Sequence, residues 1–163
     1  MPVASVIETG VRKTEWVEID YTEGMKNNLT GYLPKDNYDL IDFLPLQVEK
    51  GKGHFFEVEK YFLKHKKKVF RRFIGFFLKL YCYHDLEIDY NKKEYSNPKP
   101  EKLVSLIKDA EKKDLLIQIK AGSTVFLLTG SDLYITVYSL EENRELIETI
   151  ASSEGLFVRN RTL

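Results

Sequence analysis

This chain of 163 residues has few of the groups from which common catalytic and metal sites are built. Its single cysteine, Cys82, excludes an intrachain disulfide and any metal site that needs several thiolates. The histidines His54, His65 and His84 do not stand three or four residues apart, as zinc ligands on a helix do. We therefore predict no metal ion and no cofactor, and a lone thiol fits a reducing compartment.

The nine glycines are scattered and form none of the motifs that glycine builds at active sites. The patterns G-x-G-x-x-G, G-x-x-x-x-G-K-[ST] and G-x-S-x-G do not occur, which removes support for nucleotide-binding loops and for a hydrolase nucleophile. Cys82 has only His84 near it in sequence, and we expect a buried, inert thiol. We predict no catalytic residues and no enzymatic activity, with a site assembled from distant residues as the alternative.

The chain also lacks a long apolar run. The longest one near its centre, residues 73–78, is far shorter than the roughly 20 residues of a membrane-spanning helix. The first ten residues show no basic region followed by an apolar stretch, so no signal peptide is evident. The length and the 43% hydrophobic content fit a single domain over residues 1–163. We expect a cytoplasmic protein without a transmembrane segment.

Charge is balanced in total but unevenly distributed, with 25 basic and 25 acidic residues. Residues 60–84 carry eight lysines or arginines and no aspartate or glutamate, and they are rich in aromatics. At about 100° per residue, residues 55–83 divide into a basic and an apolar face, with only Lys66 and Leu78 on the wrong side. A single helix of this length would be unusual, so a break near residues 66–68 is expected.

The face pattern predicts which side chains of this segment are buried. We expect burial of five apolar residues: Phe62, Val69, Phe73, Phe77 and Leu80. The exposed basic set that can bind an anion consists of Lys60, Lys64, Lys67, Lys68, Arg71 and Arg72.

Before this segment, the pattern predicts strands and helices. Apolar, β-preferring positions predict strands at 3–9 and 14–20, and four- and three-residue spacings predict a helix at 22–33. A cap at Asp36 or Asn37 predicts a short helix ending at Leu44, before a loop at 45–53.

The final third alternates clear strand and turn signals. We predict a polar loop over 85–98, in which residues 84–89 alternate as a water-facing edge strand does, and a helix from Pro100 to Lys113. A three-strand antiparallel meander follows at 115–120, 124–128 and 133–138. A capping box at residues 139–142 predicts a helix beginning at 140, Gly155 ends it, and a last strand covers 156–159. The fold class is therefore α+β.

Acidic residues recur before residue 45, interspersed with aromatics. The plain interpretation is a solvated face, and the functional one is a face that docks a protein partner through aromatic anchors and rim charges. The candidate partner-binding residues are Glu15, Trp16, Glu18, Tyr32, Asp36, Tyr38, Asp39 and Asp42.

The tail TVFLLTGSDLYITVYSLEENRELIETIASSEGLFV, residues 124–158, resembles the closing hairpin, capped helix and short strand of bacterial immunity proteins. These are small cytosolic inhibitors from polymorphic-toxin systems. The resemblance implies a non-catalytic inhibitor that binds and neutralises a cognate toxin, although the neutral net charge departs from the acidic character of many nuclease inhibitors. The alternative is a nucleic-acid-binding module that uses the basic helix 60–79.

Overall fold

The computed structural model describes residues 38–160, in which seven strands form one antiparallel sheet with the order β3-β2-β4-β5-β6-β1-β7. The strands are β1 (Asp39–Asp42), β2 (Glu87–Tyr90), β3 (Lys93–Ser96), β4 (Leu116–Ala121), β5 (Thr124–Thr129), β6 (Tyr134–Tyr138) and β7 (Phe157–Asn160). The helices are α2 (Phe55–Lys64), α3 (Lys66–Tyr81), α4 (Pro100–Lys113), the 3-10 turn η2 (Glu141–Asn143) and α5 (Arg144–Ser153). This arrangement confirms the α+β class.

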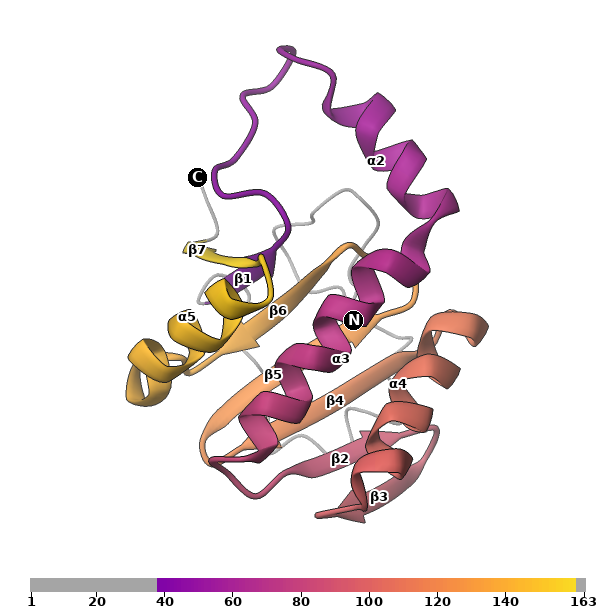
Figure 1. Cartoon of the computed structure of the whole chain (residues 1–163), viewed down its shortest axis with the longest axis vertical. Coiled ribbons are helices and arrows are strands. Elements are labelled where there is room, and N and C mark those ends of the chain that lie inside the picture. Colours follow the sequence, from indigo (N-terminus) through magenta and orange to yellow (C-terminus); the bar gives the residue numbers. More distant parts are fainter. Residues whose placement is uncertain (1–37, 161–163) are drawn as a thin grey trace.

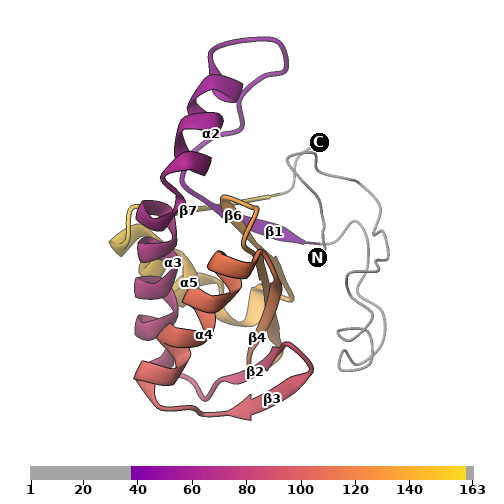
Figure 2. The ribbon, with the colours of Figure 1, turned by 90° about the vertical axis from the view of Figure 1, so that its right-hand side faces the viewer.

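Helices α3, α4 and α5 cover one face of the sheet, and α2 projects beyond its end (Figures 1 and 2). Between the two layers, the rings of Phe76 and Phe77 in α3 lie 5.7 and 5.3 Å from the ring of Phe126 in β5. All three side chains are fully buried. Rings that meet edge to face at these distances add stabilisation beyond their buried area, so α3 and the centre of the sheet form the core.

The amphipathic pattern places the faces of α3 correctly. The side chains of Val69, Phe73, Phe77 and Leu80 are buried, and the predicted cations are exposed. Phe62 is only partly buried, because it belongs to α2 and contacts Phe43 at a ring distance of 4.9 Å.

The two residues on the wrong side of that pattern are both accounted for by contacts. Lys66 is half-buried and donates a hydrogen bond to the carbonyl of Gly130 at 2.6 Å. Leu78 packs against the core. The positions of both side chains are therefore explained by tertiary contacts, which the helical period alone does not predict.

The expected helix break occurs at His65, one residue before the predicted interval. His65 has φ −123° and ψ 37°, outside the helical range, and it separates α2 from α3. Its amide donates to the Phe62 carbonyl at 3.0 Å, and its carbonyl accepts from the Lys68 amide at 3.0 Å. The polar groups of the break are thus satisfied locally, and α2 leaves the body of the protein with none of its residues buried.

One expectation before the break is wrong. The short helix predicted from Asp36 or Asn37 to Leu44 is replaced by β1, which pairs with β6 on one side and β7 on the other. Two flanking strands satisfy the backbone of β1, and this long-range pairing outweighs a local cap signal in a segment of a few residues. The strands predicted at 3–9 and 14–20 and the helix predicted at 22–33 lie outside the described residues.

The region expected as a loop at 85–98 contains a hairpin. Strands β2 and β3 are joined by Asn91 and Lys92, which both have positive φ, 52° and 67°. A two-residue turn with left-handed residues matches the twist of a hairpin, but only asparagine is a usual signal for it. The strand expected at 84–89 corresponds to β2, although β3 rather than β2 forms the edge.

The later elements agree with prediction to within one residue, except at the start of α5. Ser139 has φ 60°, and its carbonyl accepts a hydrogen bond from the Thr124 hydroxyl at 2.8 Å, so the capping box does not form. The helix begins at Arg144 after η2. Its end follows the prediction: Gly155 has φ 74°, and the Leu156 amide donates to the Ala151 carbonyl at 2.8 Å.

Replacing Phe73 tests the core assignment. Its side chain is 0% exposed, so Phe73→Ala should lower the free energy of unfolding by roughly 3–5 kcal/mol through lost burial and a residual cavity. The exposed Lys68→Ala, on the same helix, should change it by less than about 0.5 kcal/mol. Urea denaturation of the three proteins measures both effects, and an unfolding midpoint unchanged by Phe73→Ala would contradict the assignment.

Replacing Gly130 tests the contact between the β5–β6 loop and α4. A methyl group there would lie 2.5 Å from the Ala110 carbonyl oxygen and 2.8 Å from the Asp114 Cα, both backbone atoms that cannot turn aside. Gly130→Ala should therefore destabilise by about 1–3 kcal/mol. Gly75→Ala is the contrast, because there the clash is with the flexible Glu154 carboxylate and alanine favours the helix. Thermal unfolding should rank Gly130→Ala as the more damaging change.

Candidate functional site

The predicted partner-binding face is only partly described by the structure. Glu15, Trp16, Glu18, Tyr32 and Asp36 lie outside the described residues. The other three, Tyr38, Asp39 and Asp42, are at or next to β1.

These three side chains contact the sheet and α5, and they do not form an exposed rim. Asp42 is 5% exposed, and it accepts hydrogen bonds from the Arg159 guanidinium and, at 2.7 Å, from the Phe43 amide. The Tyr38 ring lies 5.7 Å from the ring of Tyr138. A carboxylate this well covered cannot serve as a rim charge, because a buried ion needs its partner within the protein. The expectation of exposed rim charges is wrong for Asp42.

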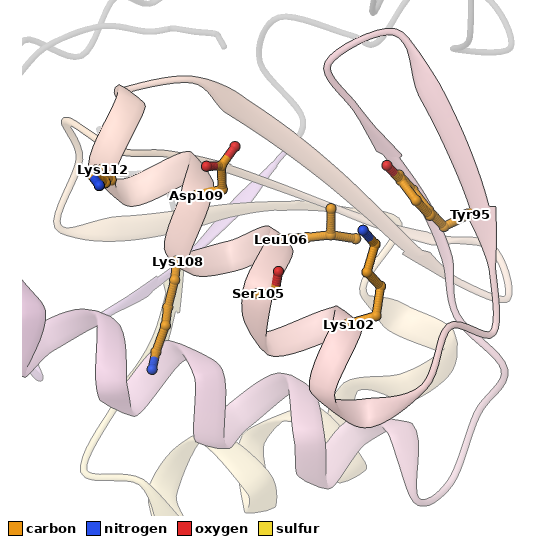
Figure 3. A pocket seen from close by; sticks show the side chains of 7 residues that line it. All are labelled: Tyr95, Lys102, Ser105, Leu106, Lys108, Asp109 and Lys112. Atoms are coloured by element: carbon orange, nitrogen blue, oxygen red, sulfur yellow. The ribbon is translucent and has the colours of Figure 1, made fainter.

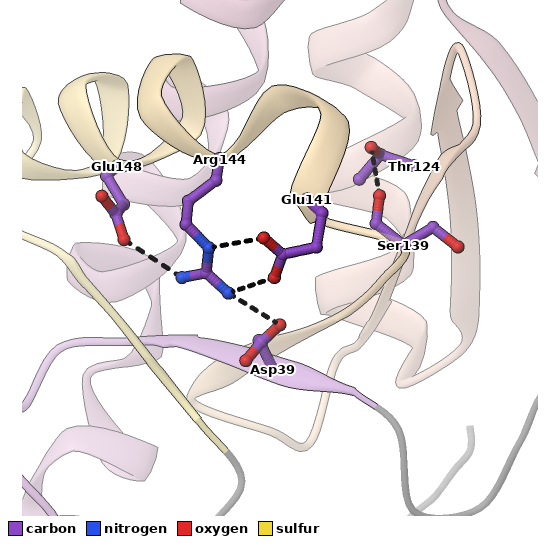
Figure 4. A network of polar contacts seen from close by, with 6 residues as sticks. All are labelled: Asp39, Thr124, Ser139, Glu141, Arg144 and Glu148. Carbon is purple, nitrogen blue, oxygen red and sulfur yellow. Dashed lines mark hydrogen bonds and ion pairs between the residues drawn. The ribbon is translucent and has the colours of Figure 1, made fainter.

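Asp39 belongs to a polar network around Arg144 (Figure 4). The Arg144 guanidinium bonds Glu141 at 2.8 Å and Glu148 at 3.1 Å, and it pairs with Asp39 at 3.7 Å. The hydrogen bond from Arg144 lowers the pKa of Glu141, whereas burial raises the pKa of Asp39 against the opposing charge of Arg144. The network connects α5 to β1, so the role of Asp39 that the structure supports is stabilisation of the fold.

The predicted anion-binding residues divide into two groups. Arg72 is engaged: its guanidinium donates to the carbonyls of Glu154 and Gly155 at 3.3 Å each, where a cation is favoured at the end of α5. Lys79 on the same face pairs with Glu154 at 2.8 Å. The remaining five are exposed and have no ion pair within residues 38–160: Lys60, Lys64, Lys67, Lys68 and Arg71.

Helix α2 adds a feature that the sequence reasoning missed. Its exposed side chains include Phe56 at 78% and Tyr61 at 52%, together with Val58 and Leu63. At the helical period Val58 falls on the apolar face of residues 55–83, yet it is exposed. The signal that could have revealed the exposure is the expected break itself, because a helix separated from the core helix need not share its buried face.

A hollow of about 440 Å³ lies between α4 and β3 (Figure 3). Lys102 is placed over the Tyr95 ring, 5.3 Å from its centre, while Lys108 and Lys112 point away from that ring. Asp109 accepts a hydrogen bond from the Tyr90 hydroxyl at 2.7 Å, which lowers the pKa of Asp109. The lining groups do not converge on one point, as the reacting groups of an active site do. The lining residues are Tyr95, Lys102, Ser105, Leu106, Lys108, Asp109 and Lys112.

Two expectations about single residues can be compared with the structure. Cys82 was expected to be buried, but it caps the end of α3 and is exposed, with its thiol 3.6 Å from the Leu78 carbonyl. No group of three histidine, cysteine, aspartate or glutamate side chains in residues 38–160 is arranged to hold a metal ion.

Asp89 is a carboxyl group whose pKa is strongly raised in the described chain. It lies on β2, where Gln118 of β4 donates a hydrogen bond to it at 3.1 Å. Burial in the sheet raises the pKa of Asp89 to about 6, Glu94 and Glu87 add repulsion, and Lys120 opposes the shift. A carboxyl group in this state destabilises the fold when it is charged.

Comparison with protein-family models, with curated protein sequences and with solved structures finds no match. Among the described helices, none combines the length and the apolar character needed to cross a membrane.

The raised pKa of Asp89 predicts a pH dependence of stability. Between pH 3.8, the pKa of the carboxyl group in the unfolded chain, and about pH 6, its pKa in the folded chain, the folded protein holds a proton that the unfolded chain has released. The free energy of unfolding therefore falls as the pH rises through this range and stays low above it. Asp89→Asn should remove the effect and stabilise the protein at neutral pH by ~1 kcal/mol, a value reduced for partial solvent screening.

Urea denaturation at about pH 4 and about pH 7 provides the measurement for Asp89→Asn. The exposed Asp85→Asn is the control, and its stability should follow that of the parent protein at both values. An equal gain for Asp89→Asn at both pH values would show that the carboxyl group is not the cause.

Proposed function

We propose that this protein is a non-catalytic protein-interaction domain that contacts its partner through α2. The observation that carries the proposal is the position of α2, which projects from the sheet with none of its residues buried while exposing aromatic and aliphatic side chains (Figure 2). Exposed apolar surface of this kind is costly in water and is typical of interaction sites. Aromatic side chains are also enriched among the residues that dominate binding energy.

The side of α2 that faces the protein differs from the side that faces water. Phe62 contacts Phe43 of the preceding loop, so this edge of the helix is held by the chain itself. Phe56, Lys60 and Leu63 follow one another at spacings of four and three and therefore share another side. A helix that presents apolar residues at these spacings fits an apolar groove on a partner.

Within this proposal, the narrower function is inhibition of a cognate toxin by a cytoplasmic bacterial immunity protein. Its support is the resemblance of residues 124–158, which fold as β5, β6, η2, α5 and β7. The lining of the hollow beside α4 offers no converging catalytic set, which fits a protein that acts by contact.

Removing the exposed apolar side chains tests the role of α2. The double variant Phe56→Ala, Leu63→Ala should unfold like the parent protein, because both residues are exposed, yet bind the partner at least about 10-fold more weakly. The assay is co-expression with a candidate toxin from an adjacent gene, scored by cell survival, with calorimetry of the purified pair.

The matched control is Tyr83→Ala, which removes an exposed aromatic at the far end of α3 and should leave protection intact. Full protection and parental affinity in the α2 variant would contradict docking through α2. A parent protein that fails to protect would reject the immunity function.

A further inference from the structure

We infer that the partner surface contacted by α2 is acidic, an apolar groove of a protein bordered by carboxylates. This inference rests on the proposed docking through α2 and specifies its partner. It is carried by five cations that have no counter-charge within residues 38–160 and that continue from α2 into the first turns of α3: Lys60, Lys64, Lys67, Lys68 and Arg71.

Within the basic segment 60–84, these five cations differ from the other three. Other cations of the same segment are used inside the fold: Lys66 donates to the Gly130 carbonyl, Arg72 to the end of α5, and Lys79 pairs with Glu154. Each of those three has its charge met by a carbonyl or a carboxylate. Within residues 38–160, the five exposed cations have no such partner, so their charge is available to another molecule.

The acidic residues of α2 do not neutralise this charge. Glu57 accepts a hydrogen bond from His54 at 2.5 Å, and Glu59 is half-buried, with a pKa that burial and then Asp42 raise. Helix α3 contains no acidic residue. Lys60 and Lys64 lie on α2, and Lys67, Lys68 and Arg71 lie on α3, so the positive surface spans parts of two helices. It is long enough to meet several carboxylates at once.

The distribution of apolar side chains favours a protein over a nucleic acid. Lys60 lies between Phe56 and Leu63 on one side of α2, so charge and apolar surface alternate there. Nucleic acids bind basic surfaces through phosphates and stack their bases on flat rings. The exposed rings of Phe56 and Tyr61 can stack on bases, but Leu63 and Val58, also exposed, offer no ring. An apolar groove accommodates aliphatic and aromatic side chains alike.

Charge reversal on α2 with a matched control tests the inference. Lys60→Glu with Lys64→Glu changes two exposed lysines four residues apart on α2, and Lys108→Glu with Lys112→Glu makes the same change on α4. Both variants alter net charge equally. Binding to the full chain is measured by fluorescence anisotropy with three labelled probes: a peptide of glutamates with leucines at helical spacing, a polyglutamate peptide of equal charge, and a DNA duplex.

We expect the glutamate–leucine peptide to bind most tightly at about 50 mM salt and to weaken as salt rises, since screening acts on exposed charges. The α2 variant should lose at least about 10-fold in affinity for it, and the α4 variant less than about 2-fold. Phe56→Ala with Leu63→Ala should reduce binding of this peptide to the level of polyglutamate.

Each other outcome overturns part of the scheme. Equal losses in the α2 and α4 variants, or no binding of the glutamate–leucine peptide at about 50 mM salt, reject an acidic partner at α2. Tighter binding of the DNA duplex identifies a nucleic-acid site in its place. If charge reversal has no effect but the apolar variant weakens binding, docking through α2 stands and the acidic partner falls. If only the apolar variant is without effect, the docking proposal itself fails.

Discussion

Packing of the phenylalanines of α3 against the centre of the sheet is the interaction on which the rest of the structure depends. Phe73, Phe76 and Phe77 are fully buried, and the last two meet Phe126 of β5 edge to face. Because this face is buried along the whole of α3, the opposite face is fixed toward water. The lysines and arginines between the phenylalanines are exposed as a direct consequence of core packing.

The same constraint determines where α2 can lie. The core contacts of α3 end near its first turn, where Lys66 binds the Gly130 carbonyl, and His65 then interrupts the helix. The residues before His65 form α2, which projects past the end of the sheet and has no buried residue. Helix α2 therefore relies on the preceding loop, as in the contact between Phe43 and Phe62. An exposed apolar helix with unneutralised lysines is the result, and both proposals of function rest on that combination.

Charged side chains have different roles according to their position. Arg144 and Arg159 fasten β1, Asp39 and Asp42 being their respective partners, and Arg72 holds the end of α5. These groups stabilise the fold and are not available for a partner. Position relative to the core, and not residue type, separates structural cations from those that can attract another molecule.

The sequence by itself determined the elements whose signals are local: the two faces of α3, the helix from Pro100 to Lys113, and the strands of the meander. Periodicity and turn residues specify these over short distances. Only the tertiary structure decided that β1 is an interior strand, that α2 is exposed, and that Arg72 is engaged while Arg71 has no ion pair among the described residues. Each of those outcomes depends on contacts between residues far apart in the chain, which no local pattern records.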